Sequence, residues 1–79
     1  MILRRAQREL QHLPYKDYDR VCEAIRALAQ NPIPPECFAL KGYIGWRIHI
    51  RDYRVIYEID EAHHLVTILH VGHRRDVYG

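Results

Sequence analysis

Apolar residues in the first part of the chain recur at the spacing of a helix. One apolar stripe, three or four positions apart, consists of Leu3, Ala6, Leu10 and Leu13. Charged and polar residues fill most of the positions between, so this pattern predicts a helix with one buried face. Pro14 ends it, because the residue before a proline disfavours helical dihedrals.

A second stripe with the same spacing follows directly, at Tyr18, Val21, Ile25 and Leu28. It predicts a helix over about residues 15–30, which the Asn and Pro residues of "NPIPPE" bring to an end. Because the connection between the two patterns is short, we expect the helices to form an antiparallel hairpin.

From "FALKGY" onward the period changes from 3.6 to two. Trp46, Ile48 and Ile50 alternate with Arg47, His49 and Arg51, as in a strand with one buried and one wet face. After a tight turn at "RDYR", a second alternating strand follows over residues 53–60, with Tyr53 and Tyr57 in phase with the core. A third, nearly unbroken apolar run over residues 65–71 indicates a central strand.

These patterns predict an α+β fold, in which a two-helix hairpin packs on an antiparallel sheet of three to four strands. The 79 residues suit a single domain covering residues 1–79. No apolar run approaches the roughly 20 residues that span a membrane, and the charged start "MILRRAQREL" does not resemble a signal peptide. We therefore expect a cytoplasmic protein that does not contact membranes.

The cysteine and histidine content gives little sign of a structural bridge or a cofactor. Cys22 lies within a helical pattern and Cys37 in a proline-flanked turn, so both are expected to be free thiols. His63 and His64 lie in an acidic turn without further ligands at metal spacing. We predict neither a metal site nor a cofactor.

Charge is segregated along the second half of the chain, although the net charge is only +2. Four cations and one acid lie between Lys41 and Tyr57, and three acids follow at Glu58, Asp60 and Glu61. In a hairpin, this order places the basic residues at one end of the sheet and the acids at the other. An anionic partner would prefer the basic end.

The basic end brings like charges together. In antiparallel strands, Arg47, His49 and Arg51 lie beside Arg54, and this repulsion is offset if a phosphate binds between them. The exit of the third strand, "GHRRDVY", would deliver Arg74 and Tyr78 to the same end. The alternative is that these side chains only solubilise the wet face of the sheet.

Three stretches of the sequence, "RAQREL", "WRIHIRDYRVIYEI" and "VGHRRDVY", resemble the RelE family of the RelE/ParE toxin superfamily. The similarity extends over almost the whole chain. It implies a microbial ribonuclease-like fold and a ribosome-dependent endoribonuclease that cuts messenger RNA in the decoding site. It also implies a cognate antitoxin, encoded beside the toxin, that holds it inactive.

The resemblance assigns the catalytic set to Arg47, His49, Arg54, Arg74 and Tyr78. Metal-free RNA cleavage needs a base for the 2′-hydroxyl, cations for the charge on phosphorus and an acid for the leaving oxygen. Arginine serves the charge, whereas His49 is better suited to exchange protons near neutral pH. Tyr78 would stack on a base or orient the nucleophile. Further RNA contacts are expected from Lys41, Arg51, His73 and Arg75.

One departure from the family concerns the N-terminus. Family members usually begin with a strand ahead of the "RAQREL" helix, and here that strand is expected to be missing or shortened. The exposed sheet edge would then be covered by an antitoxin strand or by self-association with a second copy. Two other functions stay open: a ParE-like inhibitor of DNA gyrase without nuclease activity, and an inactive relative that only binds antitoxin.

Overall fold

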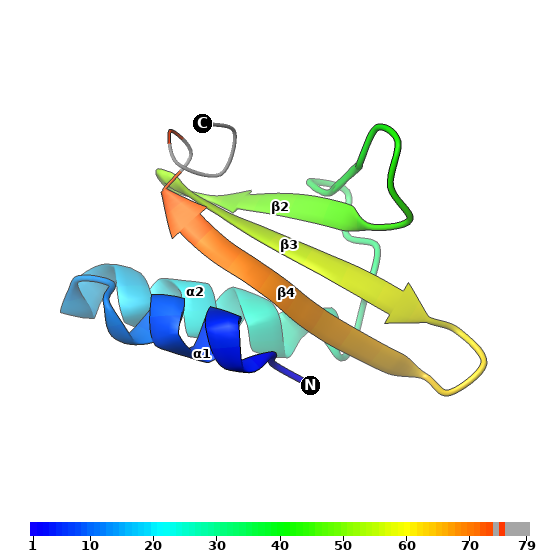
Figure 1. Cartoon of the computed structure of the whole chain (residues 1–79), viewed down its shortest axis with the longest axis horizontal. Coiled ribbons are helices and arrows are strands. Elements are labelled where there is room, and N and C mark those ends of the chain that lie inside the picture. Colours follow the sequence, from blue (N-terminus) through cyan, green and yellow to red (C-terminus); the bar gives the residue numbers. More distant parts are fainter. Residues whose placement is uncertain (74, 76–79) are drawn as a thin grey trace.

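The computed structural model describes residues 1–73 and 75, and it has two helices followed by a four-stranded antiparallel sheet. The strands lie in sequence order across the sheet, and the helices lie side by side against one of its faces (Figure 1). This confirms the predicted α+β architecture. The elements are α1 (Arg4–Gln11), α2 (Tyr15–Leu28), β1 (Phe38–Ala39), β2 (Trp46–Ile50), β3 (Tyr53–Asp60) and β4 (Leu65–His73).

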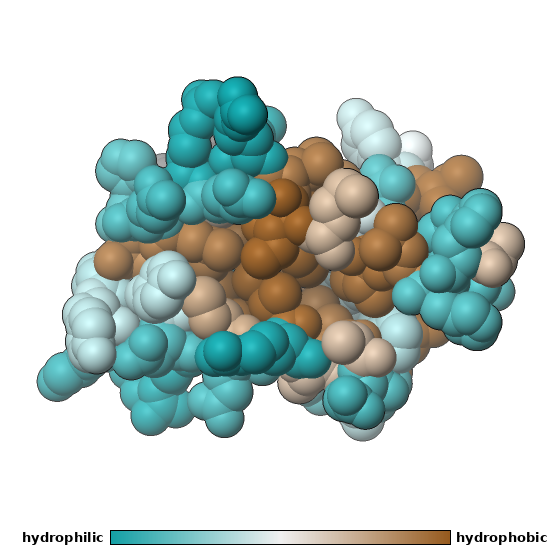
Figure 2. All heavy atoms as spheres, turned by 90° about the horizontal axis from the view of Figure 1, so that it is seen from below, coloured by the Kyte–Doolittle hydropathy of each residue, from teal (hydrophilic) through white to brown (hydrophobic). Residues whose placement is uncertain are grey.

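The core lies between the helices and the sheet. Apolar residues form a band across the middle of the molecule, flanked by hydrophilic margins (Figure 2). The predicted helical stripes and alternating strands supply its buried side chains, since one face of each element turns inward. These are Ala6, Leu10, Val21, Leu28, Ile48, Val55, Tyr57, Ile68 and Val71.

Tyr57 ties the sheet to the segment that follows α2. Its side chain is fully buried, and its hydroxyl donates a hydrogen bond to the carbonyl of Pro32 at 2.7 Å. Burial, with a smaller effect of neighbouring Cys37, raises the pKa of this phenol well above its usual value, so it stays protonated. The prediction that Tyr57 belongs to the core is confirmed.

The prediction that the third strand is central is wrong, because β4 is the last strand of the sheet. Its unbroken apolar pattern has another cause. The pairing of β3 with β4 shifts register between Ile56 and Tyr57, which leaves one extra residue in β4. Both Ile68 and Val71, three positions apart, can therefore face the helices and be buried.

The outer edge of β4 is covered by the first residues of the chain. Ile2 forms a parallel bridge with Ile68, whose N–H donates to the carbonyl of Met1 at 2.8 Å and whose carbonyl accepts from the N–H of Leu3 at 3.0 Å. The terminal amine of Met1 donates to the carbonyl of Val66 at 2.8 Å. The N-terminal strand is thus shortened to a bridge rather than missing.

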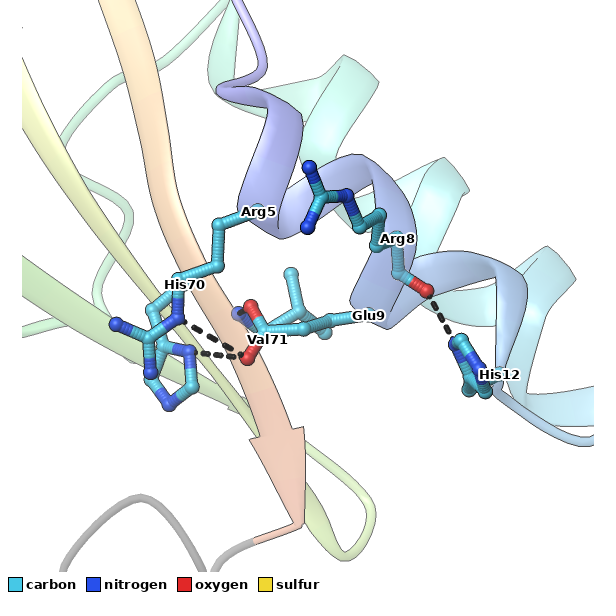
Figure 3. Close-up of polar contacts among 6 residues, drawn as sticks. All are labelled: Arg5, Arg8, Glu9, His12, His70 and Val71. Carbon is cyan, nitrogen blue, oxygen red and sulfur yellow. Dashed lines mark hydrogen bonds and ion pairs between the residues drawn. The ribbon is translucent and has the colours of Figure 1, made fainter.

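Glu9 covers the next part of this edge with a side chain (Figure 3). One carboxylate oxygen accepts a hydrogen bond from the N–H of Val71 at 2.9 Å. The other lies 2.6 Å from Nδ1 of His70 and 3.5 Å from Nε of Arg5. Since Glu9 belongs to α1, these contacts fasten the helix to the C-terminal half of β4.

Replacing Glu9 by Ala is expected to lower the free energy of unfolding by about 1–3 kcal/mol, because the N–H of Val71 loses a charged acceptor. Glu9→Gln keeps an acceptor for Val71 but loses the charge beside His70 and Arg5, so it should lower stability less. Urea unfolding of both variants measures the difference. Glu23→Ala, on the exposed face of α2, is the control. Equal stability of Glu9→Ala and wild type would show that Glu9 does not hold the edge.

Candidate nucleic-acid interface

The sheet face turned away from the helices carries the predicted basic residues of the β2–β3 hairpin. Trp46, Ile48 and Ile50 turn toward the helices, so Arg47 and His49 turn the other way. His49 is directly opposite Arg54 on β3, whereas Arg47 is opposite Ile56 and is therefore a diagonal neighbour of Arg54. Diagonal pairs lie about 7–8 Å apart in such a ladder, within reach of long side chains.

These three residues differ in exposure. His49 is exposed, whereas Arg47 and Arg54 are half-buried. Partial burial restricts the two guanidinium groups and reduces their screening by water, so an anion between them is bound more strongly than by freely moving side chains. His49 keeps access to solvent, which a group that exchanges protons with water requires.

The structure brings Arg47, His49 and Arg54 together on one face of the sheet, as predicted. The end of β4 lies beside these residues, because Arg54 pairs with Gly72. Arg74 and Tyr78 lie outside the described residues. Their convergence on this site stays a prediction.

Two further predicted RNA contacts, Lys41 and Arg75, are exposed, and of these Lys41 lies near the open face. Lys41 is exposed in the loop between β1 and β2, and it lines the same groove as Arg47. Arg75 is exposed, and its N–H donates to Nδ1 of His73 at 3.3 Å.

Arg51 continues the alternation of Arg47 and His49, but it belongs to the tight turn that is predicted at "RDYR". It lies in the two-residue turn between β2 and β3, with a left-handed φ of 56°. A tight hairpin turn requires such dihedrals, and this requirement overrides the alternation.

His73 lies on the other side of the sheet. It pairs with Tyr53, and the centroids of the two rings are 5.6 Å apart in an edge-to-face arrangement. Tyr53 is in phase with the buried residues of β3, so His73 faces the helices and is separated from His49. Burial, followed by the nearby Asp17 carboxylate, raises the pKa of Tyr53 and keeps its phenol neutral.

The acids occupy the opposite end of the sheet, as predicted. Glu58 and Asp60 lie at the far end of β3, and Glu61 is in the turn that follows. All three are exposed. The open face therefore has His49 and Arg54 toward the β2–β3 turn and the acids toward the β3–β4 turn. Lys41 departs from the prediction, because the β1–β2 loop that carries it lies at the acidic end.

Phe38 is a further candidate that the sequence patterns did not single out. The guanidinium carbon of Arg47 lies 5.4 Å from the centroid of its ring, and the ring centroid of His49 is 5.8 Å away. Its side chain is 50% exposed. The local sequence carries no signal for it, because the segment around Phe38 holds one acid, Glu36, and one cation, Lys41.

The described residues give no support for a metal site or a membrane-spanning helix. Residues 1–73 and 75 contain no group of three side chains that could ligate a metal ion. Within the same part of the chain, neither helix is long and apolar enough to span a bilayer.

These features define a class of small α+β protein that offers one open, cationic sheet face to an anionic ligand. The sequence matches, over residues 1–78, the family described as the ParE toxin of the type II toxin-antitoxin system, parDE. The chain therefore belongs to the RelE/ParE superfamily of type II toxins. Comparison with curated proteins gives no match.

Solved structures of RelE proteins share this fold. The RelBE2 toxin–antitoxin complex of Mycobacterium tuberculosis matches at 30% identity with a TM-score of 0.83, covering 94% of each chain. The archaeal RelE–RelB complex of Pyrococcus horikoshii matches at 30% identity with a TM-score of 0.82, covering 92% of this chain and 90% of that one. The isolated RelE toxin of E. coli matches at 22% identity with a TM-score of 0.79, covering 98% of this chain and 86% of that one.

If Arg47 and Arg54 share an anion, sulfate should raise the melting temperature by about 4–8 °C for each kcal/mol that its binding adds to the free energy of unfolding. Scanning fluorimetry in sodium sulfate, against sodium chloride of equal ionic strength, measures the shift. Arg54→Ala should abolish it, whereas Arg20→Ala on the exposed surface of α2 should not. A shift that survives Arg54→Ala would place the anion elsewhere.

Proposed function

We propose that this toxin is a metal-independent, ribosome-dependent endoribonuclease that cuts messenger RNA in the decoding site and so inhibits translation. The observation that carries this proposal is the placement of His49 directly opposite Arg54, with Arg47 on the same face. A proton-transfer group beside two cations is what cleavage of an RNA phosphodiester by its own 2′-hydroxyl needs.

The residues divide the work by their chemistry. Arg47 and Arg54 bind the scissile phosphate and stabilise the charge that develops on its oxygens, since guanidinium groups match these oxygens in pairs. His49 accepts the proton of the 2′-hydroxyl, whose oxygen attacks phosphorus to form a 2′,3′-cyclic phosphate, and the leaving 5′-oxygen takes a proton from water. Arg74 adds a third cation, and Tyr78 stacks on a base or orients the attacking hydroxyl.

The proposed partners follow from the family. RelE proteins of M. tuberculosis, P. horikoshii and E. coli have been crystallised with antitoxins. We expect a cognate antitoxin to hold this toxin inactive in the cytoplasm. In the part of the chain that the structure describes, the edge of β4 is paired from Val66 to Val71, so an antitoxin strand or a second copy of the chain would extend the sheet beyond that stretch.

A second function is favoured by one observation. The matching family model describes ParE toxins, and a ParE-like protein would poison DNA gyrase without cutting RNA. ParE-like members generally lack the basic and tyrosine set, which supports the nuclease instead. A relative that only binds antitoxin would show neither activity.

Mapping the 5′ ends of messenger RNA after expression of the toxin tests the proposal. We expect cuts in translated regions with codon periodicity, which disappear in Arg54→Ala and in Arg74→Ala. Arg20→Ala is the matched control, since it removes the same charge from an exposed site on α2. Intact messenger RNA together with trapped gyrase–DNA complexes would instead support the ParE-like function.

The role of His49 has its own test. His49→Gln keeps a planar polar side chain but cannot exchange a proton near neutral pH, so it should lower the cleavage rate about 10²–10⁴-fold. Affinity for programmed ribosomes should change little. Single-turnover cleavage and a filter-binding assay measure the two quantities. Unchanged turnover would remove His49 from the mechanism.

A further inference from the structure

An aromatic side chain on the open face has no role in the core. Phe38 lies on β1, a two-residue edge strand, and its side chain is 50% exposed. Leaving so much of a phenylalanine in water forgoes much of the free energy that its full burial would contribute. The ring is therefore available to a ligand.

Phe38 is in direct contact with two residues of the proposed cleavage site. It pairs with Arg47 across the β1–β2 ladder, and the Arg47 guanidinium lies over its ring at 5.4 Å from the centroid. The His49 ring is tilted by 38° to that of Phe38, with the centroids 5.8 Å apart. A group bound on the free part of the Phe38 ring would lie within one side chain's length of both.

The surroundings of Phe38 select the kind of ligand. It borders a groove of about 900 Å³ on the open face, with an apolar floor that includes Ile56 and Leu69. Arg5, Lys41 and Arg47 supply positive charge to this groove, and Glu58 is the one acid among its lining residues. An apolar floor with more cations than acids around it suits a planar base attached to a phosphate.

The geometry points to Phe38 as a stacking platform for one nucleobase of single-stranded RNA, next to the phosphate that Arg47 and Arg54 hold. This inference rests on the proposed function and specifies how the substrate is placed. Arg47 covers part of one side of the ring, so the base stacks on the exposed remainder. The adjoining phosphate then points along β2 toward His49, away from Glu58.

Stacking on Phe38 would fix the position of the RNA relative to the cleavage site. A base that stacks on Phe38 sets which phosphodiester reaches His49, so Phe38 acts on substrate binding and on the choice of the cut site. Stacking depends on the aromatic face and tolerates any base. Phe38→Leu removes the aromatic face, whereas Phe38→Tyr keeps it.

The test uses ribosomes programmed with a messenger RNA that carries 2-aminopurine in the decoding-site codon and 2′-O-methyl groups that block cleavage. Stacking quenches 2-aminopurine fluorescence. Wild type and Phe38→Tyr should quench it, whereas Phe38→Leu should fail to quench and bind about five- to hundredfold more weakly. Tyr15→Leu, which removes an 80% exposed aromatic residue from α2, should behave as wild type.

A parallel cleavage map on unmodified messenger RNA separates this inference from the proposed function. If wild type cuts RNA but Phe38→Leu quenches as wild type does, the stacking platform is overturned and the nuclease stands. If wild type does not cut but its quenching depends on an aromatic residue at position 38, the platform stands and the nuclease fails. If Phe38→Leu loses only affinity for a purified antitoxin, the groove binds protein and the inference is wrong.

Discussion

The closed edge of β4 is the constraint on which the rest of the structure depends. Unpaired edge groups invite association with other chains, and here Met1–Leu3 and the Glu9 carboxylate satisfy them from Val66 to Val71. The same contacts fix α1 against the sheet. Since Gly72 of β4 pairs with Arg54 of β3, the position of this strand also sets the wall of the basic site.

Most of the fold could be predicted from periodicity, because burial of one face leaves a strong signal. The stripe that contains Ala6 and Leu10 gave α1, and the alternation around Ile48 gave β2. The position of β4 could not be predicted, since an apolar run is equally typical of a central strand and of a strand with a bulge. The end of β2 at Arg51 could be predicted because "RDYR" is too short for anything but a tight turn, and the left-handed φ of Arg51 agrees with it.

The placement of the candidate site was predicted in part. Alternate residues of a strand face opposite sides of the sheet, and this alternation explains why the predicted placement of Arg47, His49 and Arg54 is found and that of His73 is not. Arg47, His49 and Arg54 share a face because β2 and β3 pair without a bulge at these positions. In β4, the extra residue reverses which side chains face the helices, so His73 turns toward them. The importance of Phe38 depends on the pairing of a two-residue strand, which no local pattern reveals.

The pairing of the chain's first residues with its last strand has a consequence for synthesis. The sheet grows in sequence order from β1 to β4, so three strands can pair as soon as they emerge. However, α1 packs on β4, and Ile2 bridges to Ile68. The first helix can contact α2 early, but it must wait for its place on the sheet until about residue 73 has left the ribosomal tunnel. The packing of α1 on β4 is thus a late step in the folding of a nascent chain.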